Sequence, residues 1–403
     1  MYARCRESLS IGGLGLGVRA ANLGTKRPTV NLISISKRRQ GLGAWQPLRD
    51  VSVVAIAATL ALAARSADAA STPFATMQAP FTQTLYAVRQ GPPGGNNVLG
   101  GITFDPSSGT LFGAWDVFAG GPVTAFNGSV TENGGTFVTG VELPNSQAGL
   151  GLLYYKDGTL YSNTINGVAN LDPVTGVLLR TIGTPGNALG IAVDPITQHI
   201  VYVANPCCTL TDVDPTAPTG NPTTWGVVAG STKVDGIAFD PLGQWLFLST
   251  VLPTSSMTVY HRGVGVQASF PVPGGPDGIA FHATAPAFVV TNNNDGTMTR
   301  FDFPNNDYTQ APTASLFASG GFRGDHTVVG ADGCLYATQE GARYPDGTVT
   351  GENSVVQICP GFAPTQPTPG LSRNGMLAVL AGLSAIGAFF AVRRRNGAAT
   401  QLA

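Results

Sequence analysis

Three aspartates and a histidine are the residues of this chain whose types and spacing could do chemistry. Asp235, Asp277 and Asp325 each stand at the start of a short apolar run, and His326 directly follows the third aspartate. Carboxylate oxygens are the ligands that Ca²⁺ and other hard cations prefer. A histidine beside them can serve as a base or as a further ligand. These four residues are candidates for a ligand-binding site, and the three aspartates are candidates for a Ca²⁺-type metal site.

The same aspartates have a structural alternative. An aspartate that precedes a strand can accept hydrogen bonds from the backbone amides of its own turn. Asn187, Asn292 and Asn293 would add carbonyl oxygens to a cation site if their loops face the same side as the aspartates. No complete catalytic motif accompanies these residues in the sequence, so His326 is the one candidate for a catalytic base.

The elements that must position these residues are repeats. Each repeat has an apolar run, a turn and a second apolar run, and two of the six copies are degenerate. The six are Gly100–Trp115, Leu150–Thr164, Leu189–Asn205, Asp235–Thr250, Asp277–Asn292 and Asp325–Gln339. In the clearest copy, a third strand is expected at Ser256–Arg262 and a fourth at Val266–Val272. Four strands per unit, at a period of roughly 40–50 residues, are typical of a propeller blade.

The repeats predict an all-β chain in which residues 71–361 form a six-bladed β-propeller, with seven blades as the competing count. The last repeat has room for only three strands, so Gln83–Gln90 is expected to supply the fourth strand and close the ring. Equivalent positions of successive blades converge at the axis, so the three aspartates should meet at one mouth. Gly100, Leu150 and Leu189 hold the other equivalent positions, so that mouth should be acidic on one side only.

The two ends of the chain carry targeting signals. The apolar stretch Val51–Ala70 has a positive charge before it and small residues at its end, so residues 1–70 are interpreted as a leader with a signal-peptide helix. Residues 362–375 are expected to be a Pro- and Thr-rich linker, in which a sorting motif is implied by a resemblance of the C-terminal stretch. Residues 376–395 are expected to be a transmembrane helix with an arginine cluster, which leaves residues 396–403 as a cytoplasmic tail.

The cysteines predict one disulfide and leave a second pair open. Cys334 and Cys359 are expected on neighbouring antiparallel strands of the last unit, within reach of a disulfide. The adjacent Cys207 and Cys208 could form a vicinal disulfide at a redox site, a purely structural loop bridge, or two free thiols. No CxxC or HxxxH pair supports a zinc site.

The composition of the chain argues against nucleic acid as its partner. Only 11% of the residues are charged, the formal net charge is -1, and there are 53 Gly and 29 Pro. A chain with so little net charge has no electrostatic reason to bind nucleic acid. The remaining polar residues are mostly uncharged, which is common on the surfaces of exported bacterial proteins.

The C-terminal stretch "TPGLSRNGMLAVLAGLSAIGAFFAVRRR" resembles protein-sorting domains of the IPTL-CTERM type, relatives of PEP-CTERM. The residues that match that pattern are Pro369, Leu371, Ser372 and Gly375, whereas Gly370 and Asn374 depart from it. The resemblance implies export across the inner membrane of a Gram-negative bacterium, transient anchoring there, and processing by a sorting enzyme. The expected location is the periplasm, the cell surface or the medium.

The repeats "DGIAFDPLGQWLFLST" and "LGIAVDPITQHIVYVAN" resemble NHL, YVTN and SMP-30-like propeller repeats. Those families include binding scaffolds, lactonases and a streptogramin lyase. The glutamate that lactonases of this type use for their metal has no counterpart at an inner-strand start here. The sequence therefore favours a non-catalytic binding module for an exopolysaccharide, a surface protein or a small ligand. The alternative is a metal-dependent hydrolase or lyase with its site at the propeller mouth.

Overall fold

The computed structural model describes residues 73–89, 98–115, 121–205, 207–282 and 287–362. All of them belong to one compact unit. The predicted signal helix, linker and C-terminal helix lie outside the described residues. Within the described ranges, no helix has the length and hydropathy that crossing a membrane requires.

The described residues form six sets of antiparallel strands. The sets are β3 (Leu99–Phe104), β4 (Leu111–Trp115), β5 (Val123–Glu132) and β6 (Gly135–Glu142); β7 (Gly151–Tyr154), β8 (Leu160–Thr164), β9 (Gly167–Leu171) and β10 (Leu178–Ile182); β11 (Gly186–Val193), β12 (Ile200–Ala204), β13 (Thr209–Val213) and β14 (Thr223–Val227); β15 (Lys233–Phe239), β16 (Trp245–Leu252), β17 (Ser256–His261) and β18 (Gly265–Pro271); β19 (Pro276–His282), β20 (Phe288–Asn293), β21 (Met298–Asp302) and β22 (Thr313–Ser319); and β23 (Gly324–Val329), β24 (Leu335–Gln339), β27 (Asn353–Cys359) and β2 (Thr82–Arg89). Short elements complete the described chain: β1 (Thr76–Met77), η1 (Pro304–Asn306), β25 (Ala342–Arg343) and β26 (Val349–Thr350).

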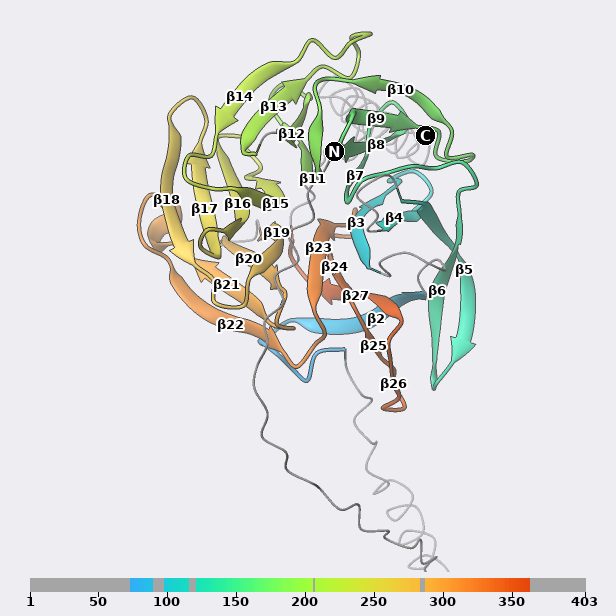
Figure 1. Cartoon of the computed structure of the whole chain (residues 1–403). Helices are drawn as coiled ribbons and strands as arrows, with labels where there is room; N and C mark the ends of the chain where they lie inside the picture. The colour runs from blue at the N-terminus through green and yellow to red at the C-terminus, as the bar shows by residue number, and fades with distance from the viewer. Residues whose placement is uncertain (1–72, 90–97, 116–120, 206, 283–286, 363–403) are drawn as a thin grey trace, which may run out of the picture. The chain divides into compact units, whose positions relative to one another are not determined.

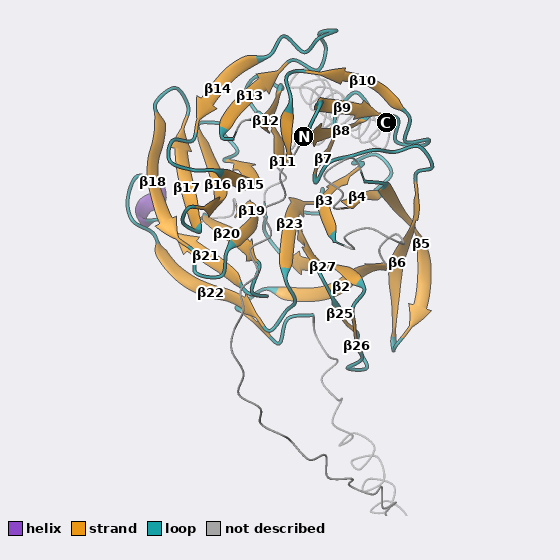
Figure 2. Ribbon diagram, viewed as in Figure 1, coloured by secondary structure: helices purple, strands orange, loops and turns teal. Residues whose placement is uncertain are grey.

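The first strand of each set lies at the centre. β3 contacts β7, and the contacts continue through β11, β15, β19 and β23 back to β3. Figure 1 shows the sheets fanning outward from these strands, and Figure 2 shows that strands and loops make up nearly the whole of the described chain. The architecture is therefore all-β and propeller-like, with a nearly closed ring of sheets.

The Asp-Pro turns that join the first two strands are fixed by local hydrogen bonds. In the fourth set, the Asp240 carboxylate accepts bonds from the amides of Leu242 (3.2 Å) and Trp245 (2.7 Å). Gly243 donates to the Asp240 carbonyl (2.9 Å) and has a φ of 66°, a conformation that favours glycine. The side chain of the aspartate thus sets the chain reversal between the two apolar runs.

The ring closes through the N-terminal strand, as the sequence predicted. β2 pairs antiparallel with β27 from Thr82↔Cys359 to Arg89↔Asn353. β2 also meets β6 at Ala87↔Val138, so the first and last sets join into one eight-stranded sheet. A feature that the sequence did not predict is β1, which pairs with the outer strand β22.

Side chains between neighbouring sheets form the core. All six residues of β20 are buried, as expected for a strand covered on both faces. Between the fourth and fifth sets, Phe247 packs edge-on against Tyr308 with ring centroids 5.1 Å apart, and Phe281 and Phe303 join the same cluster. Each such side chain contributes about 1.5–3 kcal/mol by leaving water.

Both cysteine pairs are joined in the structure. Cys334 and Cys359 form a disulfide with their Cα atoms 4.6 Å apart, and they flank the register pair Leu335↔Ile358 of β24 and β27. Cys207 and Cys208 form a vicinal disulfide in the loop after β12. Cys208 is buried in the apolar cluster between the third and fourth sets.

Candidate functional site

The three predicted aspartates lie at irregularities of the innermost strands. The β15–β16 register shifts between Val234 and Ile237, and the β19–β20 register shifts between Pro276 and Gly278. The β23–β24 register shifts in the same way around Asp325. A bulge leaves a residue outside the regular pairing and re-aims its side chain. The bulges therefore explain how these aspartates leave the pleat of their strands.

Close packing of the inner strands requires a small residue directly after the bulge position. A methyl group at Gly190 would lie 2.7 Å from the carbonyl oxygen of Asp235 in the next set. Gly236 and Gly278 face the carbonyls of Asp277 and Asp325 in the same way. The sixth set has His326 at this position, so an imidazole stands there in place of a hydrogen atom.

Two of the aspartates and the histidine form one cluster. Asp277, Asp325 and His326 each offer a ligand atom, and these atoms all lie within 4.8 Å of one another. The residues are 5%, 5% and 9% exposed, respectively. Nε2 of His326 lies 3.6 Å from Oδ1 of Asp325 and has no hydrogen-bond partner within the described part of the chain. The structure thus brings together three of the four predicted site residues.

The fourth predicted residue, Asp235, has a partner of its own. Nζ of Lys233 lies 2.9 Å from Oδ2 of Asp235, which is 1% exposed. Oδ1 of Asp235 has no hydrogen-bond partner among the described residues. The carboxylate is therefore held by an ion pair, and Oδ1 does not cap the local turn.

Burial dominates the electrostatics of this region. Burial raises the pKa of Asp277 well above its ordinary 3.8, and the neighbouring carboxylates of Asp325 and Asp235 raise it further. Burial also raises the pKa of Asp235, although the Lys233 ammonium opposes the shift. Burial lowers the pKa of Lys233, but the Asp235 carboxylate outweighs this and the net shift is upward. Burial and the Lys233 charge lower the pKa of His326 to about 4, so its imidazole is neutral at pH 7.

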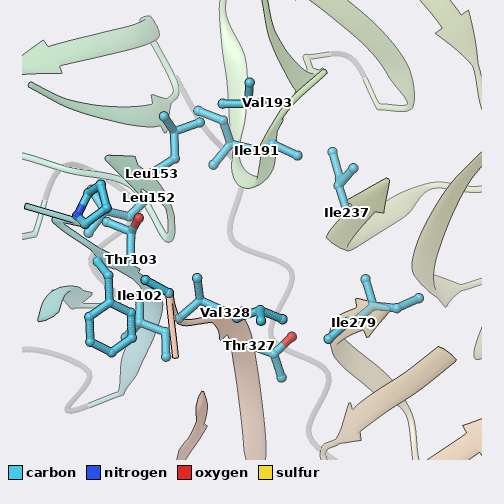
Figure 3. Close-up of a pocket in the computed structure, with 16 residues that line it drawn as sticks. Ile102, Thr103, Leu152, Leu153, Ile191, Val193, Ile237, Ile279, Thr327 and Val328 are labelled. Atoms are coloured by element: carbon cyan, nitrogen blue, oxygen red, sulfur yellow. The ribbon is translucent and has the colours of Figure 1, made fainter. Parts of the chain in front are cut away.

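A ring of aliphatic side chains lies next to the cluster along the axis. The residues that follow the glycine positions supply it, one from each set: Ile102, Leu152, Ile191, Ile237, Ile279 and, in the sixth set, Thr327. Figure 3 shows these side chains directed from different strands toward a shared space. They line a cavity of about 90 Å³, and a smaller cavity of about 40 Å³ is lined by the same ring, by the glycines and by His326.

The three asparagines that could have supplied further ligands make other contacts instead. Asn292 donates from Nδ2 to the carbonyls of Asp325 (3.1 Å) and Thr338 (2.9 Å), and its Oδ1 accepts from Gln339. Oδ1 of Asn187 accepts bonds from the Asn163 amide and the Leu189 backbone. Asn293 donates to two threonines, Thr297 and Thr299. The amide oxygens of Asn187 and Asn292 thus already accept hydrogen bonds, and their participation in a cation site stays a prediction.

Two residues near the cluster, Lys233 and Thr327, were not predicted from the sequence. Lys233 precedes the repeat and shares no pattern with the other sets, so only the structure shows its position beside Asp235. Thr327 could have been found, because the repeats read "DGI" twice and then "DHT" at Asp325–Thr327. The replacement of Gly-Ile by His326 and Thr327 distinguishes the sixth set, which contributes polar side chains where the other sets have glycine and an aliphatic residue.

Comparisons with known proteins identify the fold. No protein-family model and no curated protein matches the sequence. Among solved structures, the chain is similar to a candidate oxidoreductase (glucose dehydrogenase) from Thermus thermophilus, with 16% identity and a TM-score of 0.50 over 69% of this chain and 100% of that one.

Two further solved structures are similar at lower TM-scores. A virginiamycin B lyase from Staphylococcus aureus is 13% identical over 69% of this chain and 99% of that one, with a TM-score of 0.46. A gluconolactonase from Xanthomonas campestris is 16% identical over 73% of this chain and 95% of that one, with a TM-score of 0.47. At such identities similarity bears on the fold alone. The ring of strand contacts and the similarity to the Thermus thermophilus structure indicate that the described residues have the fold of a β-propeller repeat protein.

Proposed function

We propose that this chain is an exported, six-bladed β-propeller that acts as a binding module and takes its ligand at the acidic end of its axis. The observation that carries the proposal is the buried cluster of Asp277, Asp325 and His326, whose ligand atoms lie within 4.8 Å of one another. Nε2 of His326 has no hydrogen-bond partner among the described residues, and a bound ligand would supply one. The cyclic contacts of six innermost strands support the count of six blades.

The one-sided distribution of polar groups supports binding without catalysis. Leu150 and Leu189 stand where the fourth, fifth and sixth sets have aspartates, and Gly100 holds the position in the first set. A hydrolase that cleaves a glycosidic bond uses two carboxyl groups that flank this bond. Here the described titratable groups gather on one side of the axis, opposite an apolar wall.

Sequence features outside the described residues support the cellular context. The signal-like residues 1–70 and the IPTL-CTERM-like tail support export, transient anchoring in the inner membrane and release by a sorting enzyme. A propeller that reaches the cell surface would meet exopolysaccharides, other surface proteins and small solutes. We propose such molecules as its ligands.

Thermal unfolding of the full chain tests the binding function. Metal ions, small cations, sugars and lactones are added singly to the wild type and to Asp277→Asn. We expect at least one class to raise the melting temperature of the wild type and to lose this effect in the variant, because ligands stabilise the state they bind. A screen in which no compound gives a stabilisation that depends on Asp277 would contradict the proposal.

The second candidate function is a metal-dependent hydrolase or lyase. The observation that favours it is the mixed donor set, two carboxylates and one imidazole nitrogen, at positions close enough to share an ion. Carboxylates alone suit Ca²⁺, whereas an added imidazole also suits Mn²⁺ or Zn²⁺. Calorimetry with these three ions, followed by lactone-hydrolysis assays, distinguishes the functions. Turnover that depends on an added ion and disappears in Asp277→Ala would establish the enzyme.

A further inference from the structure

We propose that the axial site recognises a primary ammonium group on a short aliphatic chain, with the ammonium among Asp277, Asp325 and His326 and the chain against the aliphatic ring. This inference rests on the proposed binding function and names the chemical class of the ligand. It follows from two neighbouring features of the axis, a cluster of hydrogen-bond acceptors and a cavity with apolar walls.

The cluster matches the head group in charge and in hydrogen bonding. A primary ammonium has three N–H donors and no acceptor. Asp277, Asp325 and His326 offer one acceptor atom each within 4.8 Å of one another. Nε2 of the imidazole has no hydrogen-bond partner among the described residues. Charge-assisted hydrogen bonds of this kind are roughly twice as strong as neutral ones.

The cavities match the aliphatic chain. His326 belongs both to the cluster and to the wall of the smaller cavity, so the cluster and the apolar ring meet at this residue. Ile191, Ile237 and Ile279 contribute to both cavities, which have volumes of about 40 and 90 Å³. A water-sized group requires about 10–15 Å³ on this measure, so several methylene groups can be accommodated. A bare metal ion would leave this apolar surface without a contact.

The protein itself contains the same type of pair. Lys233 brings an ammonium on an aliphatic stem to within 2.9 Å of Asp235, the aspartate of the neighbouring blade position. Asp235 is as buried as the aspartates of the cluster, so the site tolerates a primary ammonium close to the axis. An incoming alkylammonium would approach Asp277 with the same type of head group and stem that Lys233 presents to Asp235.

Calorimetry and methyl NMR on the full chain test the proposal. We expect n-butylammonium to bind about tenfold more tightly than NH₄⁺, which lacks the chain, and butanoate not to bind, because its charge is opposite. Asp277→Asn and Asp325→Asn should weaken butylammonium binding about tenfold or more. Asp307→Asn is the matched control, since Asp307 lies in an exposed loop outside the axis, and it should leave binding unchanged.

The apolar half is tested separately. Ile279→Ala should weaken the binding of butylammonium about fivefold and leave that of NH₄⁺ unchanged. If the aspartate variants fail to fold, the wild type still decides the question by NMR. The isoleucine methyl signals of Ile191, Ile237 and Ile279 should shift with butylammonium, and those of residues outside the axis should not.

Four outcomes would overturn the proposal. If butanoate binds as tightly as butylammonium, the assignment of the ammonium head group is wrong. If NH₄⁺ binds as tightly as butylammonium, the assignment of the aliphatic chain is wrong. Binding of Ca²⁺, Mn²⁺ or Zn²⁺ that requires Asp277, without any binding of butylammonium, overturns the ligand class and leaves the axial binding function in place. If no cation binds in a way that depends on Asp277, the alkylammonium class of ligand is wrong. The wider screen of sugars and lactones then decides whether the chain is a binding module.

Discussion

Nζ of Lys233 lies 2.9 Å from Oδ2 of Asp235, at the edge of the acidic end of the axis. The carboxylate is almost completely buried, whereas the lysine side chain is 37% exposed. The ammonium of Lys233 therefore compensates the buried charge of Asp235 while the lysine itself remains partly in contact with water. This relationship sets the first prediction.

Lys233→Met should lower the free energy of unfolding at pH 7 by about 1–3 kcal/mol. The reason is that Asp235 would remain buried without its counter-charge, and the effect is smaller than for a fully buried pair because Lys233 is partly solvated. Urea denaturation measures it. The double variant Lys233→Met/Asp235→Asn should recover most of the loss, and a double variant as unstable as the single one would contradict the pairing.

Asp277→Asn should stabilise the protein increasingly as pH rises. The pKa of Asp277 is raised in the folded state by burial and by the neighbouring carboxylates. The contribution of such a group is fully present below the ordinary pKa of 3.8 and is lost as pH rises through the raised value. Melting temperatures of wild type and variant should therefore be close near pH 4 and separate toward pH 7. A difference that does not change with pH would refute the assignment.

Gly190→Ala should destabilise the chain by about 1–3 kcal/mol. The added methyl group would meet the carbonyl oxygen of Asp235 at 2.7 Å, and backbone atoms cannot move aside cheaply. Gly351→Ala is the matched control, because no atom lies within 4 Å of its position and its φ is not in the left-handed region. That control should be neutral or stabilising by up to about 1 kcal/mol. Thermal unfolding of both variants checks the prediction.

Removing the Cys334–Cys359 disulfide should cost about 3–4 kcal/mol, since it closes a loop of 25 residues in the unfolded chain. The comparison is Cys334→Ser/Cys359→Ser against wild type in denaturant. Cys207→Ser/Cys208→Ser serves as the control, because a bond between adjacent residues restricts the unfolded chain much less. Equal midpoints for wild type with and without reductant would show that the disulfide contributes nothing.

Ala87→Asp should destabilise the closure of the ring by about 3 kcal/mol or more. Ala87 is fully buried in β2, between Val355 of β27 and Val138 of β6. Thr84→Asp on the same strand is the control, since Thr84 is exposed and its replacement should change stability by about 0.5 kcal/mol at most. Urea midpoints measure the difference, and similar midpoints for the two variants would contradict the closing role of β2.

Local sequence patterns predicted most of the fold. The repeated phrase of glycine, apolar run, turn and apolar run predicted the two inner strands of each set, because continuous apolar runs and turn chemistry act over a few residues. The Asp240 turn formed as its composition predicted. Counting strands in the last repeat predicted that Gln83–Gln90 would complete it, and β2 does so. The vicinal pair Cys207–Cys208 had several interpretations, because the neighbouring residues do not distinguish a redox site from a structural bridge or from free thiols.

The candidate site depended on contacts that no local pattern encodes. By itself, the sequence determined that Asp235, Asp277 and Asp325 share one repeat position, and hence one end of the axis. Only the tertiary structure decided that Lys233 pairs with the first, that His326 joins the other two, and that the amide of Asn292 bonds to the backbone of the next set. The physical reason is that a repeat fixes equivalent backbone positions, whereas bulges and close packing between sheets determine where each side chain points.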